Sequence, residues 1–302
     1  MKNVLVVGQL PDPHIDSVLS FLRDRDTNIL FVDLFSPDAV AISVGFEGKV
    51  NLRINQSCMS ASDIDSVWWR VKPYYIRGSP KNKRKVLSEF LHREWRSLLE
   101  SLEFFTENLR WVNPRMSDLR ARNKPAQLLL AKQIGFHISK TLISNDLFSA
   151  LEFLNGHDTV FKVLTWYFEY PDKTIFTSKI TREHIESYPQ SVRITPCIFQ
   201  HRIEKSYELR VTAVGSDIFS VKINSQAKQS TTLDWRRDQL NVNYSVHSLP
   251  DSIENLIMKM NDRLGLLYAA YDFIVTPNGE YVFLEPSRTM ALVGRKNRDT
   301  NI

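Results

Sequence analysis

Apolar and polar residues alternate near the end of the chain and predict a β-hairpin over residues 271–287. The sequence there is YDFIVTPNGEYVFLEPS, with the turn signal Asn278-Gly279 at its centre. A two-residue turn places Asp272 directly opposite Glu285. Because like charges that face each other destabilise a sheet, we expect a cation between the two carboxylates. Mg²⁺ suits such a pair. The alternative is a solvated, partly protonated or lysine-neutralised pair.

The first third of the chain has the pattern of an α/β domain. Continuous apolar runs predict strands at 4–8 and 29–34, and helical spacing predicts a helix over 15–22 between them. Gly8 is the only glycine of the first turn, so the glycine fingerprint of dinucleotide-binding domains is absent. A long helical pattern follows over 86–107. This region is therefore predicted to be architecture and not a cofactor site.

The rest of the chain mixes short helices and strands. Residues 123–135 predict a helix that ends at a capping glycine, and 159–164 predict a strand with Lys162 inside an apolar run. A lysine there is costly to bury unless it meets an anion such as a phosphate. Snorkelling at a sheet edge is the alternative. We expect three domains, with the ranges 1–114, 115–195 and 196–302.

Composition excludes several classes of protein. The 302 residues are 43% hydrophobic and 24% charged, as in ordinary globular proteins. The net charge of +5 suits an anionic ligand, but it is too weak to indicate nucleic-acid binding, and the basic run at 81–85 favours a solvated loop. No signal peptide and no apolar run near the ~20 residues of a membrane span are present, so we expect a cytoplasmic protein that does not bind membranes.

Metal and nucleophile motifs are also excluded. The two cysteines, Cys58 and Cys197, form no disulfide framework, and the seven histidines never fall at metal-ligand spacing. What remains is an ordered set of cations, polar strand ends and carboxylates, which are the parts of a nucleotide site. Its members are Lys124, Lys162, Gln200 to Glu204, Glu208, Arg210, Asp234 to Arg236, Asp272 and Glu285.

This ordered set resembles the ATP-grasp superfamily, and within it the ligases that mature microviridin-type ribosomal peptides (graspetides). The resemblance covers well over half of the chain and implies an ATP-grasp fold of α+β lobes after an N-terminal α/β domain. The matching motifs are W-x-N-P (111–114), NK-x-x-QLLLA-x-x-x-G (123–135), TLISND (141–146), FKVL (161–164), Q-x-x-I-EK-x-x-ELRVTAVG (200–215), DWR (234–236) and YDFIVTPNGEYVFLE (271–285), with WWRVKP (68–73) in the first domain.

The resemblance implies three groups of site residues. The cofactor-binding residues are Lys124 and Lys162 for the ATP phosphates, Gln200, His201, Arg202 and Ile203 for adenine through their backbone, and Glu204 near the ribose. The catalytic residues, which would hold the γ-phosphate or the acyl phosphate, are Arg210 and Arg236. The metal ligands for Mg²⁺ are Asp272 and Glu285, with Ser287 where the family has an Asn.

The resemblance also implies a reaction and a partner. ATP phosphorylates an Asp or Glu side chain of a ribosomal precursor peptide, with its leader and core, and a hydroxyl or amine of the same peptide then closes an ester or amide ring. Two alternatives stay open. One is a glutamate or amino-acid ligase that acts on a protein tail or a small molecule. The other is a nucleotide-binding protein with impaired catalysis. A homodimer is the commonest oligomer to expect.

Overall fold

The computed structural model describes residues 1–34, 40–45, 50–54, 57–71, 83–105, 109–165 and 175–287. The chain divides into two compact units, Met1–Ser117 and Asp118–Ile302. Both units combine helices with sheets, so the predicted α/β class is confirmed. None of the helices in the described ranges is long and apolar enough to cross a membrane.

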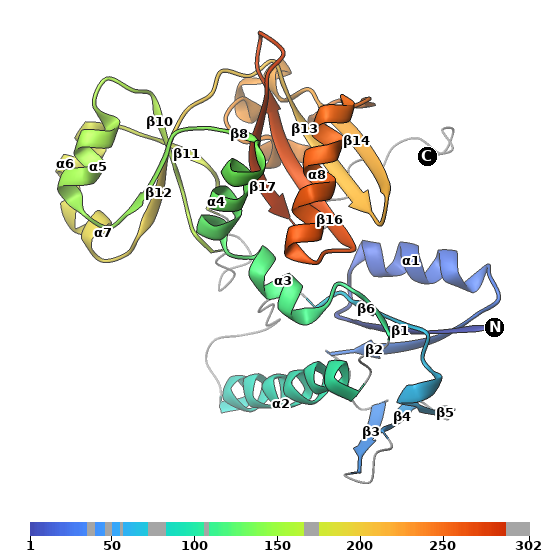
Figure 1. Cartoon of the computed structure of the whole chain (residues 1–302). Helices are drawn as coiled ribbons and strands as arrows, with labels where there is room; N and C mark the ends of the chain where they lie inside the picture. The colour runs from blue at the N-terminus through green and yellow to red at the C-terminus, as the bar shows by residue number, and fades with distance from the viewer. Residues whose placement is uncertain are drawn as a thin grey trace. The chain divides into compact units, whose positions relative to one another are not determined.

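The first unit contains a parallel four-stranded sheet of order β2-β1-β6-β7 and an antiparallel three-stranded sheet of order β3-β4-β5. The predicted strand, helix, strand opening is confirmed (Figure 1). The basic run at 81–85 falls at the edge of the described chain, and its side chains lie outside the description. The elements are β1 (Lys2–Gly8), α1 (Pro13–Arg23), β2 (Thr27–Asp33), β3 (Val40–Val44), β4 (Val50–Ile54), β5 (Ser57–Ser60), the 3₁₀ turn Ala61–Asp63, β6 (Ser66–Trp69), α2 (Lys83–Phe105) and β7 (Arg110–Val112).

The second unit, which holds the site, has two sheets. The four-stranded sheet has the order β11-β10-β12-β9, and the six-stranded sheet has the order β15-β14-β13-β16-β17-β8. Helix α3 (Arg115–Ala121) leads into this unit. Its further elements are α4 (Lys124–Ile134), β8 (His137–Ile138), β9 (Thr141–Ser144), α5 (Leu147–Leu154), β10 (Thr159–Lys162), β11 (Ser178–Ile180), α6 (Arg182–Ser187), α7 (Pro189–Arg193), β12 (Cys197–His201), β13 (Tyr207–Val214), β14 (Asp217–Ile223), the 3₁₀ segments Ser225–Ala227, Gln229–Thr231 and Trp235–Asn241, β15 (Tyr244–Val246), α8 (Asp251–Leu264), β16 (Tyr268–Val275) and β17 (Tyr281–Ser287).

In the second unit, helices cover one face of each of the two sheets. The other face of each sheet is left for the site. Helices α5, α6 and α7 pack on the four-stranded sheet through an apolar cluster that includes Ala150, Ile185 and Phe199. Helices α4 and α8 pack on the six-stranded sheet, where Ile257 and Phe283 are fully buried. Figure 1 shows α4 and α8 beside β16 and β17. Alternation along β10 and β12 therefore directs every second side chain away from the helices.

Helix α4 begins and ends where its sequence predicts. The side chain of Asn123 accepts a hydrogen bond from the Ala126 amide, and Gly135 ends the helix with φ of 105°. Strand β8 follows at once and pairs in parallel with β17. The ring of Phe136 stacks on Phe283 at 4.9 Å between centroids. Residues 121–138 thus pack in the core of the six-stranded sheet, and the division into three domains stays a prediction.

The turn between β16 and β17 is longer than predicted. Val275 faces Tyr281, so the tight two-residue turn at Asn278-Gly279 is wrong. The Gly279 amide donates to the Thr276 carbonyl at 2.9 Å, and Gly279 has a φ of 80°. A three-residue loop with a glycine in the left-handed region is a common alternative to the two-residue turn, because glycine has no Cβ to clash there.

A bulge in β17 restores the predicted carboxylate pair. Phe273 faces Phe283, but the next pair is Asp272 with Glu285, because the register shifts between them. Leu284 is therefore an extra residue on β17. Bulges of this kind bend a strand and re-aim a side chain next to a site. The prediction that Asp272 faces Glu285 is confirmed, although the register that led to it was off by one residue in the turn.

Candidate active site

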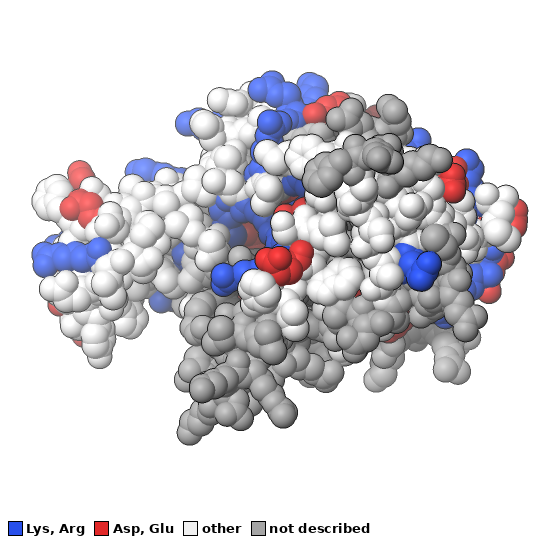
Figure 2. Space-filling model, turned by 90° about the horizontal axis from the view of Figure 1, so that it is seen from below, with Lys and Arg blue, Asp and Glu red and all other residues white. Residues whose placement is uncertain are grey.

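A pocket in the second unit brings together most of the predicted site residues. Side chains and backbone from both sheets, from the start of α4 and from the segment before β15 line it. Figure 2 shows a hollow on one face of the molecule in which basic and acidic side chains gather. The predicted residues that line the pocket are Lys124, Lys162, Gln200, His201, Arg202, Ile203, Glu208, Asp234, Trp235, Arg236, Asp272 and Glu285.

Glu285 is the carboxylate around which the cations gather. The Nζ atom of Lys124 lies 3.4 Å from its Oε2 atom. Burial acts to raise the pKa of Glu285, but the charges of Lys124, Lys162 and Arg236 together hold that pKa below its ordinary value. Glu285 is therefore an ionised carboxylate in a cationic pocket.

Asp272 faces Arg210 on one side and Glu285 on the other. The Nη1 atom of Arg210 lies 3.0 Å from both carboxylate oxygens of Asp272. Burial nevertheless raises the pKa of Asp272, because the desolvation of the carboxylate and the charge of Glu285 outweigh the attraction of Arg210. Arg210 itself does not line the pocket, so its guanidinium acts there through Asp272. Its predicted contact with a phosphate stays a prediction.

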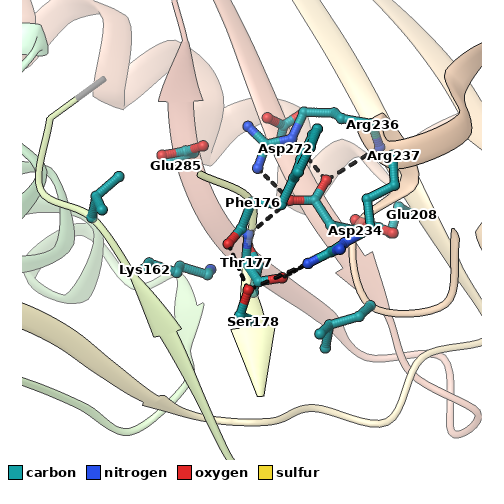
Figure 3. Close-up of polar contacts among 12 residues, drawn as sticks. Lys162, Phe176, Thr177, Ser178, Glu208, Asp234, Arg236, Arg237, Asp272 and Glu285 are labelled. Atoms are coloured by element: carbon teal, nitrogen blue, oxygen red, sulfur yellow. Dashed lines mark hydrogen bonds and ion pairs between the residues drawn. The ribbon is translucent and has the colours of Figure 1, made fainter. Parts of the chain in front are cut away.

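Lys162 projects from β10 into the pocket, where Figure 3 labels it near Glu285. Its Nζ atom donates to Oε1 of Gln200 at 2.8 Å. Burial lowers the pKa of Lys162, and the positive charges of Lys124 and Arg236 act in the same direction. Lys124 donates to the Val163 carbonyl at 2.9 Å. Two lysines from different elements thus point at one small volume, which is an arrangement for binding phosphate oxygens.

Asp234 positions the third cation of the pocket. Its carboxylate accepts two hydrogen bonds from the guanidinium of Arg236, at 2.8 Å from Nε and at 2.6 Å from Nη2. It also accepts from the Thr177 amide at 3.1 Å, as Figure 3 shows. Arg236 holds the pKa of Asp234 below its ordinary value even though burial acts to raise that pKa. The segment before β15 is thereby fixed to the start of β11.

Arg237 makes a second connection between the same two segments. Its Nη2 atom donates to the Thr177 carbonyl at 3.0 Å and to the Ser178 hydroxyl at 3.3 Å (Figure 3). Its guanidinium lies 5.1 Å from the ring centroid of Phe176. The side chains of Arg236 and Arg237 therefore point in different directions, since only Arg236 lines the pocket. The sequence did not distinguish them beyond the DWR motif.

The predicted adenine segment divides its groups between the two faces of β12. The ring of His201 stacks on His157 at 4.1 Å and lies 4.5 Å from Phe153, which leaves its backbone for the pocket. Arg202 forms an ion pair with Asp158 at 2.9 Å. Glu204 does not line the pocket. Its predicted place near the ribose stays a prediction.

Two charged residues of the pocket, Lys205 and Glu208, have no assigned role in the sequence prediction, although Glu208 belongs to the predicted set. Lys205 donates to Glu208 at 2.7 Å and to the Leu233 carbonyl at 3.2 Å, and both side chains of the ion pair are less than one-tenth exposed, at 8% and 9%. Burial raises the pKa of Glu208, although Lys205 acts to lower it. The only sequence signal for this ion pair is the spacing of three residues between the opposite charges of Lys205 and Glu208. It could not show that the pair turns inward.

The described residues contain no group of three or more histidine, cysteine or carboxylate side chains that could hold a metal alone. The pair Asp272 and Glu285 fits Mg²⁺ bound together with phosphates, since Mg²⁺ usually takes one or two carboxylates plus substrate oxygens. The backbone of Ser287 faces Ala270 on β16, and its side chain lies outside the description. The role of Ser287 as a third ligand stays a prediction.

Comparison with known proteins gives one kind of match. The sequence matches no family model and no curated protein. Among solved structures, the chain is similar to a RiPP-associated ATP-grasp ligase of Chryseobacterium gregarium, determined in complex with ADP and a leader and core peptide. The TM-score is 0.82 at 27% identity, over 95% of this chain and 89% of that one. The chain has the fold of the ATP-grasp ligases.

Two further solved structures are similar to this chain. The macrocyclase MdnC of Microcystis aeruginosa MRC, bound with its precursor peptide MdnA, has a TM-score of 0.78 at 26% identity, over 97% of this chain and 92% of that one. The ATP-grasp ligase PsnB, complexed with a precursor variant, Mg and ADP, has a TM-score of 0.74 over 97% of this chain and 91% of that one, and at 19% identity its likeness concerns the fold. The predicted resemblance of this ATP-grasp protein to the graspetide ligases is confirmed.

Proposed function

We propose that this ATP-grasp protein is an ATP- and Mg²⁺-dependent ligase that closes ester or amide rings within a ribosomal precursor peptide. The proposal rests on one observation above all. Lys124, Lys162 and Arg236 surround Glu285 in a pocket of a fold that matches a RiPP-associated ligase over 95% of the chain. The cations suit the phosphates of ATP, and the carboxylates suit its magnesium.

The chain's own residues supply positioning and charge. Lys124 and Lys162 bind phosphate oxygens of ATP, and Asp272 and Glu285 hold Mg²⁺. When bound, Mg²⁺ neutralises charge on the phosphates. Arg236, fixed by Asp234, stabilises the negative charge of the transferred phosphate. The ATP anhydride supplies the driving force, so the protein needs to align the peptide carboxylate and to neutralise charge.

The activated carboxylate then reacts within the same peptide. A side-chain hydroxyl or amine attacks the acyl phosphate, phosphate leaves with its electron pair, and the nucleophile loses its proton. We assign three working parts to this cycle, residues 1–114, 115–195 and 196–302, with ATP between the last two. We place the reaction in the cytoplasm, where both ATP and newly made precursor are found.

Mass spectrometry of the peptide product tests the proposal. Protein, ATP, Mg²⁺ and a leader-core precursor that contains Thr, Ser or Lys with Asp or Glu are incubated together. We expect the peptide to lose one water for each ring and one ADP to form for each water lost. Lys162→Met removes a pocket cation, and Lys179→Met removes an exposed lysine of the neighbouring strand β11, so only the first is expected to stop the reaction.

The other outcomes identify the rival functions. A gain of mass equal to an added amino acid would indicate an amino-acid ligase that acts on a chain end. ATP binding without ADP formation, with every precursor and amino acid tried, would indicate a nucleotide-binding protein without turnover. Ser287, at the position where the resemblance to the graspetide ligases implies Asn, is the feature that favours this last candidate.

A further inference from the structure

The amide group of Gln200 links the pocket lysine Lys162 to a hydroxyl on the neighbouring strand. Gln200 lies on β12 directly opposite Thr141 on β9. Lys162 faces Ile198, so it lies diagonally from Gln200 within reach of a long side chain. The Nε2 atom of Gln200 lies 2.9 Å from Oγ1 of Thr141, and its Oε1 atom lies 2.8 Å from Nζ of Lys162.

The direction of every bond in this chain is fixed. The hydroxyl of Thr141 lies 2.8 Å from the Ser139 carbonyl, which can only accept, so the single hydroxyl proton is used there. Thr141 must then accept from Gln200, which places the NH₂ group of the amide on that side. The carbonyl oxygen of Gln200 therefore faces Lys162, which can only donate. The Gln200 side chain cannot turn over without losing a bond at each end.

Burial makes this arrangement matter. Gln200 is 3% exposed and Ser139 is also 3% exposed, so neither can exchange its partner for water at low cost. A buried NH₂ group without an acceptor is unfavourable, and the Gln200 side chain would rotate to find one. The ammonium group of Lys162 would then lose the oxygen that holds it in place.

We propose that Thr141 is a positioning residue for Lys162: through Gln200 it fixes the lysine in the direction in which it meets a nucleotide phosphate. This inference rests on the proposed function, because it takes Lys162 as a phosphate ligand. Thr141 touches neither phosphate nor metal in this scheme. Its hydroxyl sets the orientation of the amide, and the amide sets the place of the ammonium group.

The chain offers a matched control for the Thr141 hydroxyl. Thr159 lies on β10, the strand on the other side of β12, and donates its hydroxyl to the carbonyl two residues before it, His157, at 3.1 Å. Thr141 does the same with Ser139. Thr159 does not line the pocket. Thr141→Val and Thr159→Val therefore remove the same local bond, and only the first also removes an acceptor from Gln200.

Nucleotide binding to the purified full-length protein tests the proposal. We expect Thr141→Val to raise the dissociation constants of ATP and ADP by about tenfold, the ratio that a lost hydrogen bond of ~1.4 kcal/mol gives. The dissociation constant of adenosine should stay unchanged, because adenosine has no phosphate. Thr141→Ser keeps the hydroxyl and should restore wild-type affinity. Thr159→Val should bind all three ligands like the wild type. In a Lys162→Met background, Thr141→Val should cause no further loss.

Several results would overturn the proposal. Wild-type affinity of Thr141→Val for ATP would contradict it, and so would a loss of affinity for adenosine as large as the loss for ATP. A similar loss of ATP affinity in Thr159→Val would also contradict it, as would losses of ATP affinity from Thr141→Val and Lys162→Met that add in the double variant. If the valine variant does not fold, Thr141→Ala removes the same hydroxyl, and the same comparison applies. Because binding is measured without a peptide, failure of ring formation would count against the proposed function and not against the role of Thr141.

Discussion

Asp272 faces Glu285 because Leu284 is an extra residue in β17. In a regular hairpin with the observed turn, Leu284 would face Asp272 and the carboxylate of Glu285 would fall out of register. The bulge therefore brings the two carboxylates together, and like charges that face each other need cations beside them, which Arg210 and Lys124 supply in part. Metal binding at this site therefore depends on Asp272 and Glu285 together.

Glu285 is expected to control the response to magnesium. Glu285→Gln keeps the size of the side chain and removes the charge that Lys124 and Lys162 surround. We expect the activity at fixed Mg²⁺ to fall by at least about 10- to 100-fold, because that is already the loss when a residue that only orients a metal ligand is removed. The measurement is ADP formation with precursor during a titration of Mg²⁺. Glu280→Gln, in the exposed turn, is the control, and an unchanged titration in Glu285→Gln would exclude the metal role.

Lys162 is expected to carry much of the affinity for phosphate. Lys162→Met keeps the apolar stem and removes a buried charge whose hydrogen bond to a phosphate is worth about 1.5–3 kcal/mol. We therefore expect the dissociation constant of ATP to rise by about 10- to 100-fold, measured by calorimetry. Lys179→Met removes an exposed lysine of β11 that pairs with Asp158 at the surface, and it should bind ATP normally. Equal affinities in the two variants would refute this role.

Arg210 is expected to stabilise the fold as well as the site. Its side chain is 7% exposed and its partner Asp272 is buried enough for its pKa to be raised. Arg210→Met should lower the free energy of unfolding by about 3 kcal/mol, because it leaves an uncompensated carboxylate in the protein. Urea unfolding without nucleotide measures this change. Adding Asp272→Asn should recover part of the loss, and a double variant that is less stable than Arg210→Met would contradict the explanation.

His201 is expected to make the protein less stable in mild acid. Burial lowers the pKa of His201, and the nearby charges of His157 and Lys140 act in the same direction. As the pH falls through ~6.5, the unfolded chain therefore takes up a proton before the folded protein does, and stability decreases with decreasing pH until the lower, folded pKa is passed.

The slope of stability between pH 7.5 and 5.5 tests this expectation. His201→Phe keeps a ring against Phe153 and His157 and cannot titrate, so part of the slope should disappear. Some slope should remain, because burial also lowers the pKa of His247. An unchanged slope in His201→Phe would show that His201 titrates equally in both states.

Local patterns predicted the elements well, because their causes lie within a few residues. Asn123 and Gly135 mark the ends of α4 through capping and a left-handed φ, and both follow from short-range chemistry. The apolar run around Lys162 predicts a lysine that either meets an anion or reaches solvent at a sheet edge, and the structure directs it into the pocket. These features need no knowledge of the tertiary fold.

The parts that the sequence could not predict depend on pairing between distant segments. Nothing in the residues around Leu284 distinguishes a bulged strand from a regular one, so the turn was placed one residue short. Thr141 meets Gln200 only because β9 pairs with β12, 59 residues away. The inward direction of Lys205 and Glu208 depends on the Leu233 carbonyl, which also lies far along the chain.

Strand β8 has a consequence for how the chain can be divided. It forms the edge of a sheet whose other strands come from residues 207–287, and α4 just before it covers the same core. A fragment that starts after residue 195 would expose that core and the open side of β17 to aggregation. We therefore expect residues 118–195 and 196–302 to fold only together, which makes them suited to complementation when both are produced in one cell. Insertions and fusion points therefore belong in exposed loops and not at the junction of the predicted lobes.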